Sequence, residues 1–347
     1  MEVLPDFRNG IYNVPHTILN ILGIKSNKVL EPIKDLKEDK IFFILVDAFG
    51  YNLFEKYIKD FCDYDHFKLT SLFPSTTSAV LTTLYTGLSP KEHGILEWYM
   101  YYEEFGEIIK TLPFSRKDGK ENDELIKLGF SPKNLFNLPT IFEKLKKEDI
   151  DSKFFVRKDY ASSSYTLHMG KGAKIVPYTS LENVFQLLKK SNAALNFLYI
   201  DYLDIAQHHY GPNSKETKDL LLKIWKNIVD LKNHTKERTI VTADHGQIEV
   251  SKNFIIDVPK DLVGGSPRDV FLYSDYLPSL DYMDVLNKED ILKLLGPGKE
   301  HPKLKERVPN YILLPKDSYT IWFEDFALKG LHGGLSAEEM FVPFILV

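Results

Sequence analysis

Three apolar runs of this sequence end at an aspartate, and one of these aspartates is followed directly by a histidine: Asp47, Asp201, Asp244 and His245. Asp204 and His208 lie four residues apart, which places both on one face of a helical turn. His332 stands near the end of the chain. Aspartate and histidine ligands without cysteine suit Zn²⁺ in a hydrolytic site, or Mn²⁺ where carboxylates predominate.

A second chemical feature is a run of hydroxyl side chains at residues 75–78 (STTS), directly before a helical pattern at residues 80–86. The free N–H groups at a helix N-terminus attract phosphate. A threonine there, ionised by a metal, is a nucleophile for phosphorus. Taken alone, this segment reads as an ordinary helix cap, and a lone strand-end aspartate reads as a turn former. The combination is far more specific than its parts.

The apolar runs themselves predict the fold. Residues 41–46, 193–200 and 238–243 read as strands of a parallel sheet, and residues 138–147, 180–190 and 214–232 as helices. This alternation predicts a doubly wound, mostly parallel α/β sheet flanked by helices. Such sheets bind ligands at the carboxyl ends of their strands, where the aspartates stand.

The Gly- and Pro-rich segment 249–325 interrupts this alternation, with short strand patterns at 269–273 and 311–314. We predict a small inserted cap subdomain at 249–325, and a catalytic core formed by residues 1–248 and 326–347.

Composition narrows the class of protein. The 347 residues carry 44 basic and 49 acidic side chains, a net charge of −5, and the charges are interspersed. This argues against a nucleic-acid partner. The single cysteine, Cys62, excludes an internal disulfide framework and a cysteine-based zinc site. No apolar run approaches the ~20 residues that cross a bilayer, and the N-terminus lacks signal-peptide character. We therefore expect a cytoplasmic protein without a membrane partner; the oligomeric state stays open.

Several motifs in fixed order carry a family resemblance. They are residues 46–50 (VDAFG), 73–77 (FPSTT), 86–90 (TGLSP), 92–95 (EHGI), Asp204 with His208 and 211–212 (GP), 243–246 (ADHG) and 332–333 (HG). Together they look like the alkaline phosphatase superfamily, and within it the type I phosphodiesterase/nucleotide pyrophosphatase branch. The resemblance runs from residue 41 to the end of the chain, apart from the insertion.

The resemblance implies an alkaline phosphatase-like fold, two Zn²⁺ ions (or Mn²⁺ or another divalent metal) and a phospho-threonine intermediate. The nucleophile is Thr77 rather than Thr76, because the family motif places it four residues after the Phe of Phe-Pro. Two metals ~3.5–4 Å apart clamp the attacking and leaving oxygens of a displacement. The implied ligands are Asp47, Thr77, Asp244 and His245 for one zinc, and Asp204, His208 and His332 for the other.

The implied activity is hydrolysis of a small-molecule phosphodiester or nucleotide. The family's phosphate-binding asparagine is missing, because Trp98 stands near its place. Trp98 and Arg268 are candidate substrate contacts. No arginine lies between Arg8 and Arg116, which favours diesters over doubly charged monoesters. The alternatives are a phosphomonoesterase or phosphoglycerate-mutase-like phosphotransferase of the same superfamily and, from another class, a non-catalytic metal-binding module of a larger assembly.

Overall fold

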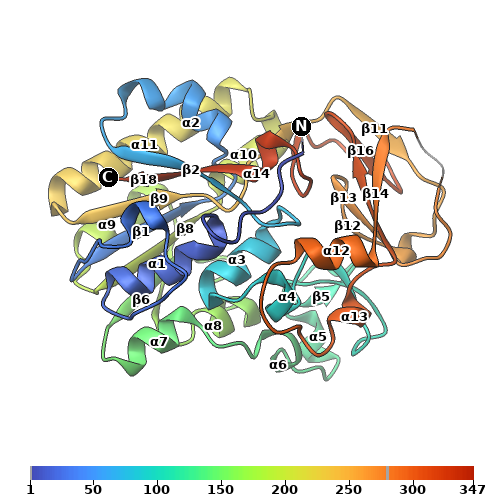
Figure 1. The fold of residues 1–347 in the computed structure, drawn as a ribbon, viewed down its shortest axis with the longest axis horizontal. Helices are drawn as coiled ribbons and strands as arrows, with labels where there is room; N and C mark the ends of the chain where they lie inside the picture. The colour runs from blue at the N-terminus through green and yellow to red at the C-terminus, as the bar shows by residue number, and fades with distance from the viewer. Residues whose placement is uncertain (1, 279–280) are drawn as a thin grey trace.

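A computed structural model describes residues 2–278 and 281–347 and contains two large sheets (Figure 1). The first sheet has seven strands, and its central strands run parallel. In spatial order they are β2 (Asp65–Thr70), β18 (Phe341–Leu346), β9 (Arg238–Thr242), β1 (Ile41–Val46), β8 (Leu195–Ile200), β6 (Ser152–Arg157) and β7 (Lys174–Tyr178). The predicted doubly wound, mostly parallel sheet is confirmed.

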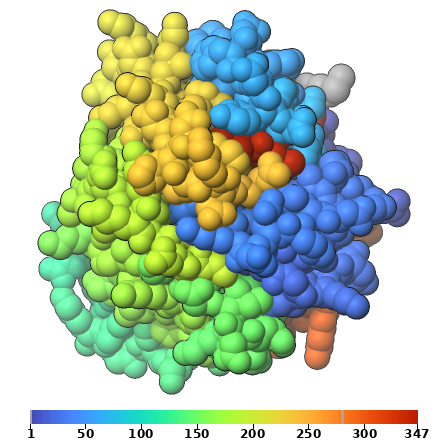
Figure 2. All heavy atoms as spheres, turned by 90° about the vertical axis from the view of Figure 1, so that its left-hand side faces the viewer, coloured from blue at the N-terminus to red at the C-terminus, as the bar shows by residue number. Residues whose placement is uncertain are grey.

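The C-terminal strand β18 departs from the parallel arrangement. It runs antiparallel to both β2 and β9. Figure 2 shows the red C-terminal atoms between the light-blue and orange segments that hold these two strands. The C-terminal strand therefore lies between β2 and β9 in this sheet, whose strands β1, β8 and β9 are almost wholly buried, as the mostly apolar runs 41–46, 193–200 and 238–243 predict.

Helices cover both faces of this sheet (Figure 1). One face carries α1 (Val14–Ile21), α3 (Thr77–Thr86), α7 (Ile141–Lys147) and α8 (Ser164–Met169), which contact one another. The other carries α2 (Tyr51–Tyr57), α9 (Leu181–Lys189), α10 (Tyr202–Tyr210) and α11 (Lys215–Thr235). The three predicted helices correspond to α7, α9 and α11. Each begins directly after a Ser or Thr whose side chain accepts a backbone N–H of the first turn, so the sequence marks their starts.

The second sheet is antiparallel. Its strands are β14 (Met283–Asn287), β15 (Tyr311–Pro315), β13 (Asp269–Leu272), β12 (Val263–Ser266), β3 (Tyr99–Tyr102), β4 (Glu107–Lys110) and β5 (Ser115–Arg116). The last three lie outside the predicted insertion 249–325. They join it because Tyr99 of β3 pairs with Gly265 of β12. The sheet is therefore built from two separate chain segments.

The remaining elements are short. Two small ladders pair β10 (Ile248–Glu249) with β17 (Gly330–Leu331) and β11 (Lys252–Ile255) with β16 (Tyr319–Trp322). The other helices are α4 (Pro90–His93), α5 (Glu124–Lys127), α6 (Lys133–Phe136), α12 (Lys288–Leu294), α13 (Leu304–Arg307) and α14 (Ala337–Met340), with 3₁₀ turns at Ile11–Asn13, Glu31–Ile33, Lys59–Phe61 and Lys260–Leu262. No helix in the described part of the chain is long and apolar enough to cross a membrane.

Two buried carboxyl groups meet where the second sheet joins the core. Glu97 precedes β3, Asp269 begins β13, and both carboxyl groups are buried close enough for the charge of Glu97 to act on Asp269. Ser266 Oγ also donates to Asp269 Oδ1 at 2.5 Å. Burial raises the pKa of Glu97 to about 7, and burial together with the charge of Glu97 raises the pKa of Asp269 well above its ordinary range. The folded protein therefore holds a proton here that the unfolded chain loses near pH 4.5.

This pair predicts a pH dependence of stability. Because the folded pKa is raised, the stabilisation is present at low pH and is lost as pH rises from about 4.5 to about 7, at about 1.4 kcal/mol per pH unit for each proton released. Glu97→Gln removes this titration and keeps the size of the side chain. Urea unfolding of metal-free protein at pH 5 and pH 7 should show a smaller loss in Glu97→Gln than in wild type. Glu103→Gln, at an exposed side chain, is the control. Equal losses in all three proteins would contradict the assignment.

Candidate active site

The site lies at the carboxyl ends of three neighbouring strands. Asp47 directly follows β1, Asp244 follows β9 after one residue, and Asp204 lies in the first turn of α10, after β8. Because β1 lies between β9 and β8 in the sheet, the three carboxylates converge on one edge. All seven of the residues predicted to hold metal lie in this one region.

Three of these residues surround the imidazole of a fourth, His245. Its Nε2 lies 3.5 Å from Asp47 Oδ1 and 3.4 Å from Asp244 Oδ2. The same nitrogen lies 3.1 Å from Thr77 Oγ1. Asp47, Asp244 and His245 form one group whose ligand atoms lie within 4.8 Å of one another. We call Asp47, Thr77, Asp244 and His245 the first cluster.

The other three residues gather at Asp204. Its Oδ1 lies 3.3 Å from His208 Nε2 and 3.8 Å from His332 Nε2. We call Asp204, His208 and His332 the second cluster. The two clusters adjoin, because the rings of His245 and His332 stack with centroids 3.7 Å apart. Asp204, His245 and His332 form a second group whose ligand atoms lie within 4.8 Å of one another, so both clusters contain candidate metal ligands.

The short ladder between β10 and β17 brings the distant His332 to this edge. Gly330 of β17 accepts a hydrogen bond from His208 Nδ1 at 2.8 Å. His332 Nδ1 donates in turn to the carbonyl of Ser75 at 3.0 Å. Each imidazole thus has one nitrogen held by a backbone carbonyl, which leaves Nε2 to face the cluster as a metal ligand does.

The backbone around Asp244 is shaped for close approach. Asp244 Oδ1 accepts the N–H groups of Ala48 (3.1 Å) and His245 (2.9 Å). Ala48 adopts a left-handed conformation with φ of 61°, which a non-glycine residue rarely adopts. A Cβ on Gly246 would lie 2.1 Å from the carbonyl oxygen of Glu338. The Asp-His-Gly sequence therefore needs its glycine, because α14 packs against that backbone.

Burial dominates the electrostatics of the site. It raises the pKa of Asp47 well above its ordinary value, with the charges of Asp244 and Asp204 adding to the effect, and raises the pKa of Asp244 to about 6. It lowers the pKa of His245 to about 4 and that of His332 to about 3. For Asp204, burial acts upward, but the attraction of His208 brings the pKa below its ordinary value. The site therefore combines buried neutral imidazoles with carboxylates whose negative charge is not neutralised by a lysine or arginine of the described residues. This combination is typical of a site that binds a cation.

Orphaned oxygens test the fit of a metal. Asp47 Oδ1 and Asp244 Oδ2 are buried without a hydrogen-bond partner. Among the ion pairs of the described residues, none joins a lysine or arginine to Asp47, Asp204 or Asp244. A bound dication would supply the missing positive charge, and aspartate and histidine are ligands that zinc accepts. The donor set therefore fits the predicted metal centre.

Thr76 and Thr77 occupy different positions. Thr76 is the N-cap of α3: its Oγ1 accepts the N–H of Ala79 and donates to the carbonyl of Leu96 at 2.9 Å. Thr77 is the first residue of α3, and its half-buried hydroxyl faces His245. Only the Thr77 hydroxyl is thus free to act on a ligand.

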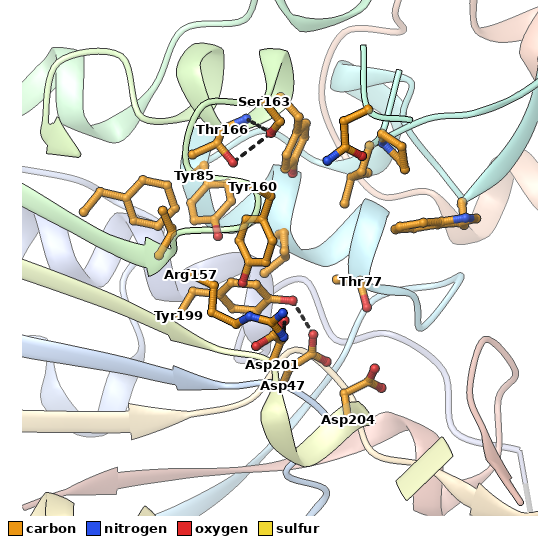
Figure 3. A pocket seen from close by; sticks show the side chains of 18 of the residues that line it. Asp47, Thr77, Tyr85, Arg157, Tyr160, Ser163, Thr166, Tyr199, Asp201 and Asp204 are labelled. Carbon is orange, nitrogen blue, oxygen red and sulfur yellow. Dashed lines mark hydrogen bonds and ion pairs between the residues drawn. The ribbon is translucent and has the colours of Figure 1, made fainter. Parts of the chain in front are cut away.

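A cavity of about 370 Å³ opens beside Thr77, Asp47 and Asp204 (Figure 3). Apolar and aromatic side chains form most of its wall, and Trp98 is among them. Arg157 also lines it, but its guanidinium contacts Asp201 at 3.0 Å and Asp159. The cavity accepts an organic group next to the hydroxyl of Thr77.

The structure places Arg268 away from this cavity. Its buried guanidinium binds Glu339 of α14 at 2.9 Å and donates to the carbonyls of Pro315, Asp317 and Tyr319. These contacts tie the turn between β12 and β13 to α14 and to the segment that joins β15 and β16. The predicted substrate contact at Arg268 therefore does not form here, because the buried guanidinium binds Glu339 and backbone carbonyls instead.

Two other histidines also lie outside the clusters. His209 is exposed on α10, on a different face from His208. His93 is buried and pairs with Thr83 Oγ1 at 3.0 Å, while its other nitrogen accepts the N–H of Ile95. His93 thus holds the turn after α3.

Sequence reasoning missed two residues that touch the clusters. Tyr199 donates a short hydrogen bond to Asp47 Oδ2, and Gln247 Nε2 donates to Asp204 Oδ1 at 2.5 Å. Tyr199 stands on β8, two residues before Asp201, so strand alternation was a signal that it faces the same side. Gln247 directly follows the Asp-His-Gly sequence, and its identity alone carries no comparable signal.

Comparison with known proteins gives a consistent result. The sequence profile of the type I phosphodiesterase/nucleotide pyrophosphatase family matches residues 41–316. Bis(5′-adenosyl)-triphosphatase enpp4 of Mus musculus is 25% identical, over 94% of this chain and 74% of the mouse protein. Among solved structures, murine ectonucleotide pyrophosphatase/phosphodiesterase 5 matches with a TM-score of 0.68 and 19% identity, over 89% of this chain and 88% of that one. Phosphonoacetate hydrolase from Sinorhizobium meliloti matches with a TM-score of 0.62 and 17% identity, over 88% and 89%.

Proposed function

The chain belongs to the type I phosphodiesterase/nucleotide pyrophosphatase family of hydrolases, and we propose that it cleaves small phosphodiesters or nucleotide pyrophosphates through Thr77 and two zinc ions. The observation that carries this proposal is the position of the Thr77 hydroxyl. It lies 3.1 Å from His245 Nε2, at the N-terminus of α3 and at the mouth of the cavity. A nucleophile, a cation site and a binding cavity thus share one edge of the sheet.

In the proposed reaction, Thr77 Oγ attacks phosphorus and forms a threonine phosphoester as the bond to the leaving oxygen breaks. Water then attacks the same phosphorus, so that the phosphate product leaves and the Thr77 hydroxyl is restored. The first cluster would hold one cation and the second cluster the other. When bound, the cations supply the charge that favours the deprotonated hydroxyl and the departing oxygen.

The chain's own groups contribute orientation. Thr77 is the first residue of α3, and the free N–H groups at that helix end favour negative charge on a phosphoryl group. The pKa of His245, lowered by burial to about 4, keeps its imidazole neutral at pH 7. His245 is therefore a metal ligand in this scheme, not the general base that accepts the proton of Thr77.

The relatives support a nucleotide substrate. The mouse relative bears the name of a bis(5′-adenosyl)-triphosphatase, and the murine structural relative is described as an inactive threonine-to-alanine variant in complex with AMP. The aromatic wall of the cavity suits an organic group of this kind. A non-catalytic metal-binding module has no need for the free hydroxyl of Thr77.

The charge of the cavity predicts a preference for diesters. A monoester brings a second negative charge, and the one arginine lining the cavity, Arg157, is already paired with Asp201 and Asp159. We expect kcat/KM for bis-p-nitrophenyl phosphate to exceed that for p-nitrophenyl phosphate by at least about tenfold, or ~1.4 kcal/mol. Steady-state kinetics on both substrates with zinc-loaded protein measure this ratio. A monoester preference that Arg157→Ala abolishes would move the function to a phosphomonoesterase.

A further inference from the structure

Each carboxylate of the site has one oxygen held by a donor of the protein. Two backbone N–H groups hold Asp244 Oδ1. Side chains do the same for the others: the hydroxyl of Tyr199 for Asp47 and the amide of Gln247 for Asp204. We propose that Tyr199 and Gln247 are positioning residues, Tyr199 for the cation held by the first cluster and Gln247 for the cation held by the second. This inference rests on the proposed function.

Tyr199 fixes which oxygen of Asp47 is available. It lies on β8 beside Leu45 of β1, two residues before Asp47, so its hydroxyl reaches the carboxylate across the strand pair. The hydrogen bond to Oδ2 is drawn in Figure 3. Oδ1 is left buried without a hydrogen-bond partner, 3.5 Å from His245 Nε2. The free oxygen therefore faces the other ligands of the first cluster.

Gln247 acts on the second cluster from the loop between β9 and β10. Its amide Nε2 donates to Asp204 Oδ1 at 2.5 Å and reaches the Asp204 carbonyl at 3.3 Å. The side chain is almost fully buried, and a Cβ added to Gly330 would lie 2.4 Å from its Oε1. The amide is thus confined by β17, the same strand that leads into His332. Gln247 thus contacts Asp204 and packs against the strand that precedes His332.

Both donors are neutral, and this matters for a cation site. A lysine or arginine would orient a carboxylate equally well but would repel the metal. A phenol or an amide orients the carboxylate without neutralising its negative charge. Loss of such a contact to a metal ligand typically costs 10–100-fold in metal affinity. Loss of the Tyr199 contact should therefore weaken zinc binding at the first cluster, and loss of the Gln247 contact should weaken it at the second.

The test measures zinc affinity in proteins that keep one cluster intact. His208→Ala leaves the first cluster, and Asp47→Asn leaves the second. Zinc dissociation constants come from competition with a chromophoric chelator on metal-free protein. In the His208→Ala protein, Tyr199→Phe should weaken zinc binding about tenfold, and Gln247→Met should change it less than about twofold. In the Asp47→Asn protein, Gln247→Met should weaken zinc binding about tenfold, and Tyr199→Phe should change it less than about twofold.

Control variants separate positioning from general damage. Tyr160 lines the same cavity, and its hydroxyl makes no hydrogen bond among the described residues, so Tyr160→Phe should leave zinc affinity unchanged. Urea unfolding of the metal-free proteins checks that each variant folds. Tyr199→Leu and Gln247→Leu replace any variant that does not.

The outcomes are distinct. Wild-type protein that binds no zinc would overturn both the proposed function and this inference. Wild type that binds two zinc ions, with variants that bind them equally well, would overturn the positioning roles alone. Equal weakening of both clusters by either variant would overturn the assignment of one residue to each cluster.

Discussion

Replacing Thr77 with alanine is expected to lower kcat for bis-p-nitrophenyl phosphate by at least about 10³-fold, because the substitution removes the group that attacks phosphorus. Folding and zinc binding should persist. The side chain is half buried at the start of α3, and six other candidate ligands remain around it. Steady-state kinetics, zinc content and urea unfolding of the purified variant measure the three quantities.

The neighbouring Thr76→Ala variant is the matched control. Thr76 caps α3 and donates to Leu96, so its loss should cost about 0.5–2 kcal/mol of stability and far less activity. The two variants should therefore show opposite patterns. Thr77→Ala should lose activity and keep its stability, whereas Thr76→Ala should lose stability and keep most of its activity. Equal turnover by wild type and Thr77→Ala would refute covalent catalysis by this residue.

The second large effect concerns the second cluster. His208→Ala removes the imidazole that lies 3.3 Å from Asp204 and hydrogen-bonds Gly330. We expect the variant to retain about one zinc ion in place of two, and to lose at least about 100-fold in kcat/KM for the diester, because the leaving oxygen then lacks its cation. Zinc analysis of dialysed protein and diester kinetics measure the two losses.

His209→Ala separates this effect from damage to α10. His209 is the next residue on the same helix and is exposed to solvent. Its replacement should leave zinc content and kcat/KM within about twofold of wild type. Identical behaviour of the two histidine variants would contradict the assignment of His208 to the second cluster.

The sequence predicted the core elements well, because strong local signals marked them. The strand at 41–46 is apolar throughout, and Ser or Thr caps mark the starts of α7, α9 and α11. The strand-end positions of Asp47 and Asp244 followed from these elements. His332 was different: motif resemblance alone suggested it, since only the ladder between β10 and β17 brings it into place.

The remaining features depend on contacts between distant segments. Residues 99–116 join the second sheet through one pairing with Gly265, which no local pattern encodes. Arg268 does not contact the cavity as predicted, because it pairs with Glu339, 71 residues away in the sequence. Strand alternation predicts which face of the sheet carries Tyr199, but only the register of β8 on β1 sets its hydroxyl beside Asp47. Local sequence could not supply this information.

The central claim is that two bound cations and Thr77 together hydrolyse a phosphodiester. Its most direct test is a zinc titration of metal-free wild-type protein, with hydrolysis of bis-p-nitrophenyl phosphate as the readout and Thr77→Ala titrated in parallel. We predict negligible turnover without metal, a rise that saturates near two zinc ions per chain, and no comparable rise in Thr77→Ala. Undiminished turnover by the metal-free protein, or no turnover at saturating zinc, would contradict the account.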